Sequence, residues 1–173
     1  MNPGPVAARV RGVTVVELVV ALAVVAILTV IAVPSMRDFI NENRSRSTMN
    51  QLVADLNFAR VEAIKRNARV LICPRVAGAS TCATVTTAWI NGWLVCYDAD
   101  ADGNCDATAA NDPNPMKIAN AIHDTMTLTN PATLVRFNPV GSAAAQVIFT
   151  LTSATTVRTG TVAATGSVSS KKN

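Results

Sequence analysis

The chain has 173 residues, enough for one compact domain with an appended element and too few for two large domains. Half of the residues are hydrophobic, 4% are aromatic and 15% are charged, and the apolar residues concentrate near the N-terminus, which indicates a membrane segment followed by a soluble part. The net charge is +4, but without Arg9 and Arg11, which precede the apolar run, 13 basic and 11 acidic residues remain, a near balance that excludes the basic footprint of a dedicated nucleic-acid binder.

The apolar run extends over residues 13–33 and contains one charged residue, Glu17. A helix needs about 20 apolar residues to cross a bilayer, so this run is predicted to be a single transmembrane helix. Its many valines do not prevent this, because lipid offers the backbone no hydrogen-bonding partner outside the helix. A cleaved signal peptide is the alternative, but its hydrophobic region is about 7 to 15 residues long, and here the helical pattern continues past Pro34.

Glu17 is the most informative residue of this run. A charge inside a membrane segment costs roughly 2.5 to 3.5 kcal/mol at mid-bilayer on insertion scales, and therefore indicates a function. Cleavage between Gly12 and Val13 would create an α-amino group four residues before Glu17. That group, from the same chain or a neighbouring subunit, would supply a cation for the carboxylate.

The sequence Gly12-Val13-Thr14-Val15-Val16-Glu17, followed by an apolar helix, resembles the type III signal of type IV prepilins and pseudopilins. The resemblance implies that residues 1–12 are a leader, that a prepilin peptidase cleaves after Gly12 and methylates the new N-terminus at Val13, and that Glu17 serves filament assembly. Pro34 falls where the family commonly has a helix-bending proline. Val13 is a departure, because phenylalanine is commoner there.

Beyond the apolar run, the pattern predicts an α+β protein with a pilin-like long helix packed on a β-rich head. Residues 34–68 are predicted to be the amphipathic half of the helix, with an apolar stripe at Met36, Phe39, Ile40, Leu52, Val53, Leu56, Ala59, Ala63 and Ile64. Residues 69–162 are predicted to be the head, with strands at 69–73, 89–97, 116–122, 134–137, 147–151 and 155–162. Residues 163–173 are predicted to be a flexible tail.

Three stretches of this part resemble the GspH/FimT branch of the family: residues 59–67, Cys73-Pro74 and residues 89–95. The resemblance implies a minor subunit, not an enzyme, that helps to prime a type IV pilus or the type II secretion pseudopilus. Its implied partners are other pilin subunits, prepilin peptidase, the inner-membrane assembly platform and, before assembly, membrane lipid. The implied location is the bacterial inner membrane, single-pass with a periplasmic head, and then the filament tip.

The four cysteines are Cys73, Cys82, Cys96 and Cys105, which allow three pairings. The pairs Cys73 with Cys82 and Cys96 with Cys105 are favoured, because each is nine residues apart across a predicted turn. Arginines lie on both flanks of the apolar run, so they do not decide the orientation of the chain in the membrane. Disulfides would decide it, because they would place the head in an oxidising compartment. Free or buried thiols in a reduced chain are the alternative.

The acidic residues Asp98, Asp100, Asp102 and Asp106 surround Gly103 with the spacing of a calcium loop. An EF-hand would require glutamate where Ala109 stands, so a solvated turn braced by Cys96 and Cys105 is favoured over a metal site.

The sequence contains no set of nucleophile, base and orienting residue, its one histidine is His123, and no cofactor is predicted. Some FimT-like minor pilins bind DNA through a C-terminal Gly-Arg-x-Arg motif, and Gly166-Ser167-Val168-Ser169 corresponds to it without either arginine. Their loss removes the phosphate contacts that dominate affinity, although Lys171 and Lys172 remain. DNA binding for natural transformation and adhesion at the tip are therefore the alternatives to an assembly role.

Overall fold

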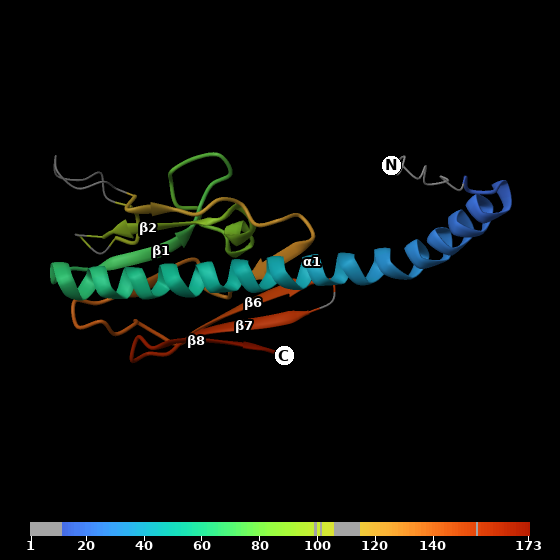
Figure 1. Cartoon of the computed structure of the whole chain (residues 1–173). Coiled ribbons are helices and arrows are strands. Elements are labelled where there is room, and N and C mark those ends of the chain that lie inside the picture. The colour runs from blue at the N-terminus through green and yellow to red at the C-terminus, as the bar shows by residue number, and fades with distance from the viewer. Residues whose placement is uncertain (1–11, 99, 101, 106–114, 155) are drawn as a thin grey trace, which may run out of the picture. The chain divides into compact units, whose positions relative to one another are not determined.

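The computed structural model describes residues 12–98, 100, 102–105, 115–154 and 156–173 (Figure 1). The chain divides into two compact units, Met1–Phe39 and Ile40–Asn173. Within the described residues, one long helix, α1 (Val15–Arg66), precedes eight short strands, and this order confirms the predicted α+β class. The predicted leader lies outside the described residues, apart from Gly12.

The first unit contains the N-terminal part of α1, which begins with a capping box. The Glu17 amide donates to Thr14 Oγ1 at 3.2 Å, and the Thr14 amide donates to the Glu17 carboxylate at 3.3 Å. These reciprocal bonds satisfy two of the amide groups that a helix start leaves without a partner. Among the described residues, α1 is the one helix long and apolar enough to cross a membrane, and its most apolar stretch is not buried at all.

The second unit contains the C-terminal part of α1, which packs on the head through an apolar stripe. The buried members follow one another three and four residues apart, the spacing of one helix face: Met49, Leu52, Leu56, Ala59 and Ala63. Four expected members are exposed instead: Met36, Phe39, Ile40 and Ile64. The stripe that packs on the head therefore begins at Met49.

The head consists of two antiparallel four-stranded sheets (Figure 1). The first has the order β3-β2-β1-β5, from Lys117–Ile118, Trp93–Tyr97, Val70–Pro74 and Val135–Phe137. The second has the order β4-β6-β7-β8, from Met126–Thr129, Val147–Ser153, Val157–Val162 and Val168–Lys172. Strands β4 and β6 alternate buried and exposed residues, which is typical of a sheet with one face on the core. Every residue of β1 is buried, because both faces of that strand are covered.

Trp89 and Trp93 lie at the centre of the core, but not on one strand. Trp89 belongs to the 3-10 helix η1 (Thr86–Asn91), where its ring packs edge to face on Phe149, with the two ring centroids 4.9 Å apart. Gly92 separates η1 from β2 with a φ of 90°, and a Cβ there would lie 2.2 Å from the Ala119 carbonyl oxygen. This turn is the reason that the predicted strand 89–97 is only Trp93–Tyr97.

The predicted flexible tail is wrong, because residues 168–172 form β8. Its partner is β7, with a register from Arg158 opposite Lys172 to Val162 opposite Val168. A tight turn connects the two strands at Gly166, whose φ is 81°. Strand β4 was not predicted from the sequence. The third predicted strand, residues 116–122, is limited in the structure to the two residues of β3.

Candidate functional sites on the helix and the head

The predicted processing segment lies at the beginning of the described chain. Gly12 and Val13 precede the helix and are exposed, and among the described residues beyond its chain neighbours no atom lies within 4 Å of where a Gly12 Cβ would stand. The Glu17 carboxylate lies beside the Thr14 amide, one residue after Val13. If the chain were cleaved after Gly12, the new α-amino group would lie on the residue next to this Thr14 amide. The pattern Thr14-x-x-Glu17 was the signal from which the capping box could have been found.

The surface of α1 around residue 33 is an apolar groove. It has a volume of about 570 Å³, and its lining residues are Thr29, Ala32, Val33, Ser35, Met36 and Phe39. The two hydroxyls do not add free polar groups, because Thr29 donates to the Ala26 carbonyl at 2.8 Å and Ser35 to the Ala32 carbonyl at 3.0 Å. This surface is therefore compatible with lipid or with an apolar protein surface.

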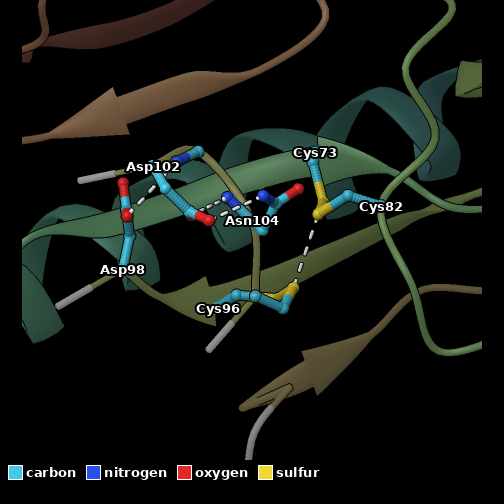
Figure 2. Close-up of a disulfide and its surroundings, with 8 residues drawn as sticks. Cys73, Cys82, Cys96, Asp98, Asp102 and Asn104 are labelled. Carbon is cyan, nitrogen blue, oxygen red and sulfur yellow. Dashed lines mark hydrogen bonds between the residues drawn. A yellow bond between two sulfur atoms is a disulfide. The ribbon is translucent and has the colours of Figure 1, made fainter. Parts of the chain in front are cut away.

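Two disulfides link the first sheet to its loops. The structure pairs Cys73 with Cys82 and Cys96 with Cys105, with Cα separations of 5.6 and 5.2 Å. These are the pairs that the nine-residue spacing favours. The two bridges also touch, because Cys82 Sγ lies 3.4 Å from Cys105 Sγ (Figure 2).

The acidic loop follows β2, and its described carboxylates already have protein partners. Asp98 is fully buried and accepts a 2.6 Å hydrogen bond from Arg136 of β5, as well as one from the Gly103 amide. Asp102 accepts from the side chain and the backbone of Asn104, and these bonds lower the pKa of Asp102 (Figure 2). A calcium ion would compete with the Arg136 guanidinium for Asp98, so the arrangement favours a structural turn. Asp106 lies outside the described residues, and the preference for a solvated turn over a calcium loop stays a prediction.

The C-terminal lysines differ in their surroundings. Lys172 donates to Glu42 of α1 at 3.2 Å, and Arg158 of β7 binds the other oxygen of the same carboxylate. Burial by itself would raise the pKa of Glu42, but the Lys172 hydrogen bond and the two positive charges outweigh it and lower the pKa. Lys171 is exposed. Ser167 and Ser169, which stand where the DNA-binding motif has arginines, are exposed at the turn and on β8.

Two buried carboxylates, Asp55 and Glu62, were not predicted from the sequence. Asp55 lies on the core side of α1, where it accepts from Trp93 Nε1 at 2.9 Å and from Lys117 Nζ at 2.8 Å. Glu62 accepts from Arg66 one turn later at 2.7 Å, and this bond lowers the pKa of Glu62. Acidic residues within the stripe of Leu52, Leu56 and Ala59 were the available signal.

His123 is a surface residue whose ring contacts Arg44 of α1 and the next residue in the chain, Asp124. Its Nε2 lies 2.8 Å from Arg44 Nη1, and because arginine only donates, Nε2 is the acceptor. Its Nδ1 lies 2.7 Å from the Asp124 carboxylate. His123 and Arg44 line a pocket of about 280 Å³ that includes Gln51 and Trp93. The described residues that line this pocket include no cysteine and no acidic residue, so they offer neither a nucleophilic thiol nor a general-base carboxylate.

Comparison with known families gives a match to the model described as type II transport protein GspH, over residues 48–166. That range is more than half of the chain. The protein belongs to the GspH family. GspH proteins are structural subunits of the pilin class, so the family confirms that this chain is not an enzyme. The single apolar helix and the family together indicate a membrane-anchored chain with a soluble head.

Solved structures show the same fold for this GspH protein. The crystal structure of the type IV minor pilin FimU from Pseudomonas aeruginosa in space group P21 is 17% identical, with a TM-score of 0.57, and covers 77% of this chain and 92% of FimU. The P65 crystal form is 16% identical, with a TM-score of 0.53, and covers 73% and 91%. No curated protein sequence gives a match. The GspH match begins at residue 48, so it does not test the predicted processing signal at residues 12–17.

Proposed function

We propose that this GspH protein is a minor subunit that helps to prime the assembly of a type IV pilus or a type II secretion pseudopilus. A prepilin peptidase cleaves it after Gly12 and methylates Val13. The helix from residue 13 to 33 then holds it in the bacterial inner membrane, with its head in the periplasm. From there an inner-membrane platform transfers it into the filament, at the tip.

One observation carries this proposal: the N-terminal part of α1 exposes an apolar surface that the described chain does not cover. The side chains of Val15, Leu22 and Ile27 are 78%, 61% and 64% exposed. Burial of such a side chain is worth about 1.5 to 3 kcal/mol, so a long row of them requires a solvent or partner that is itself apolar. Lipid meets this requirement before assembly and the helices of other subunits meet it afterwards.

Glu17 distinguishes these two environments. In lipid its carboxylate has the Thr14 amide and hydroxyl, within the same helical turn. A charge needs a countercharge in a low-dielectric environment, and the α-amino group of a neighbouring subunit's Val13 would provide it in the filament. The pairing therefore favours the assembled state over the membrane state.

Processing is tested by the mass of the chain recovered from membranes of the producing bacterium. The expected chain begins at a methylated Val13, and Gly12→Val is expected to stay uncleaved in the membrane because the larger side chain obstructs the peptidase. Normal processing of Gly12→Val would contradict the proposal. So would a cleaved chain that leaves the membrane in a carbonate wash, which is the behaviour of a secreted protein with a signal peptide.

Assembly is tested by comparing Glu17→Gln with Asp38→Asn, since both variants neutralise one carboxylate on α1 and only Glu17 lies in the apolar run. We expect Glu17→Gln to be processed but to be lost from sheared filaments, while Asp38→Asn is incorporated as the wild type is. Equal incorporation of all three proteins would refute the pairing step. Loss of pili or loss of secretion in a deletion strain then identifies the filament.

A further inference from the structure

The four cysteine sulfurs form one cluster instead of two separate bridges. All four Sγ atoms lie within 4.8 Å of one another, and the contact between the two disulfides is 3.4 Å. In a tetrahedral site with zinc to sulfur distances of about 2.3 Å, neighbouring sulfurs lie about 3.8 Å apart. The separations between the two bridges, which include 3.4 Å and do not exceed 4.8 Å, lie around this value, whereas the two bonded pairs would have to move apart.

The fold gathers these sulfurs by means other than the S–S bonds. Cys73 and Cys96 are buried on one face of the paired strands β1 and β2, two residues apart in register, since Cys73 is opposite Leu94 and Leu71 opposite Cys96. The loop that carries Cys82 returns to β1 through the Ala83 amide, which donates to the Pro74 carbonyl at 2.7 Å. These hydrogen bonds do not involve the sulfur atoms.

The second loop is held in the same way. Asp98 follows β2 directly and is fixed by Arg136 of β5, and the Gly103 amide donates to the Asp98 carboxylate two residues before Cys105. Leu71, Leu94 and Leu134 surround the sulfurs and limit the access of water. Such an apolar shell strengthens the attraction between thiolates and a cation.

We propose that the four cysteines, in their thiol form, are a tetrathiolate site for one soft divalent metal ion, with Zn²⁺ as the expected ligand. The cysteines are thiols when the chain is synthesised. Binding converts four thiols and one Zn²⁺ into a zinc tetrathiolate and releases four protons. The metal and the two disulfides exclude each other, because a disulfide sulfur is no longer a thiolate. Both close the same two loops, 74–81 and 97–104.

The spacing of the cysteines in the sequence does not indicate a metal site. Structural zinc sites usually have cysteines two to four residues apart within a pair, and here each pair is separated by nine. Antiparallel strands supply the proximity that short spacing supplies elsewhere, because β1 and β2 place Cys73 and Cys96 on one face as diagonal neighbours. Metal binding by the reduced head and incorporation into a filament are measured separately, so either can fail without the other.

The test uses the full chain in detergent micelles, with its disulfides reduced by a phosphine. In this reaction each disulfide becomes two thiols, and the phosphine becomes a phosphine oxide with the oxygen of water. Co²⁺ is titrated as a spectroscopic substitute for Zn²⁺. We expect one Co²⁺ per chain, with the intense visible bands of a tetrahedral tetrathiolate, and displacement of the cobalt by Zn²⁺. Absence of these bands, or the weak absorption of octahedral cobalt, would overturn the proposal.

Three controls make the result specific. The oxidised chain is expected to give no cobalt bands. Cys82→Ser and Cys105→Ser are each expected to lower the affinity at least about tenfold, since even the loss of an outer partner of a metal ligand costs 10 to 100-fold. The reduced chain in urea has the same cysteines without the fold, and if it bound Co²⁺ as tightly as the folded chain, the claim that the strands build the site would fail.

Discussion

Both parts of helix α1 contain leucines, and the leucine side chains of the two parts have opposite surroundings. Leu18, Leu22 and Leu28 are 56%, 61% and 58% exposed, whereas Leu52 and Leu56 are at most 1% exposed. The second group packs on the sheets of its own head. The first group can gain the same free energy only from an apolar partner outside the chain.

The carboxylates on α1 differ in the same way. Asp55 and Glu62 in the head are bonded to cationic side chains of the same chain, and Asp55 also to an indole. Glu17 bonds only to Thr14 among the contacts found in the described chain, and Thr14 has no charge. Asp55 and Glu62 therefore have cationic partners within the chain, whereas the partner of Glu17 among the described residues is neutral.

The largest expected effect comes from a matched pair of leucine truncations. Leu56→Ala removes a fully buried side chain and should lower the free energy of unfolding of the head by about 2 to 5 kcal/mol. Leu22→Ala should leave the thermal midpoint of the head unchanged and should reduce incorporation into filaments. Both are measured on the full chain in detergent, by thermal denaturation of the tryptophan signal. A similar loss of head stability in both variants would remove the distinction between the two parts of α1.

The next effect concerns β8, where two glycines of positive φ allow a controlled comparison. A Cβ at Gly166 would lie 1.8 Å from the Gly141 carbonyl oxygen, whereas a Cβ at Gly78 would meet nothing within 4 Å. Gly78→Ala therefore carries only the conformational cost of about 1 kcal/mol. Gly166→Ala adds a backbone clash and should cost about 2 to 3 kcal/mol. Hydrogen exchange of residues 168–172 should accelerate in Gly166→Ala, and unchanged protection there would contradict the docking of β8.

The third effect concerns the buried hydrogen bonds of Asp55. Asp55→Ala leaves the Trp93 indole N–H without its acceptor inside the core, and should lower the free energy of unfolding by about 1 to 3 kcal/mol. Asp55→Asn keeps an oxygen for the indole and loses only the charge that faces Lys117, so its loss should be smaller. Urea denaturation measures both variants. Equal losses in the two would show that the indole bond is not the main contribution.

The sequence was sufficient for those parts of the molecule whose physical signal is local. The apolar run, the helical spacing of Leu52, Leu56 and Ala59 and the β-branched runs each reflect a period of a few residues. The favoured cysteine pairs depended on a single turn between partners. The family match over residues 48–166 and the FimU-like fold agree with the resemblance read from these motifs.

What the sequence did not predict depends on contacts between distant segments. Strand β8 has a weak apolar pattern and exists because β7 provides a partner and Gly166 allows the turn. The pairing of Glu42 with residues 158 and 172 joins segments more than 110 residues apart. The exposure of Met36 and Phe39 could not be read from their spacing, because periodicity shows that a stripe exists and does not show where its partner ends.

The smallest expected effect is a pH dependence at Glu42, which ties α1 to β7 and β8. Because the folded state lowers the pKa of this carboxyl below its ordinary value of 4.5, the stabilisation is fully present above that value and is lost as the pH falls through the lowered one. Glu42→Gln should therefore be less stable than the wild type at neutral pH, and the difference should shrink on acidification below about pH 4.5.

Two lysine variants show whether this dependence belongs to the ion pair. Lys172→Ala removes the hydrogen bond to Glu42 and should reproduce part of the change, whereas Lys171→Ala, at the neighbouring exposed position, should not. Urea denaturation of the four proteins at about pH 7 and about pH 3.5 compares them on either side of the carboxyl's ordinary pKa. If Glu42→Gln kept the same deficit at both pH values, the tie between α1 and the C-terminal strands would depend on packing and not on charge.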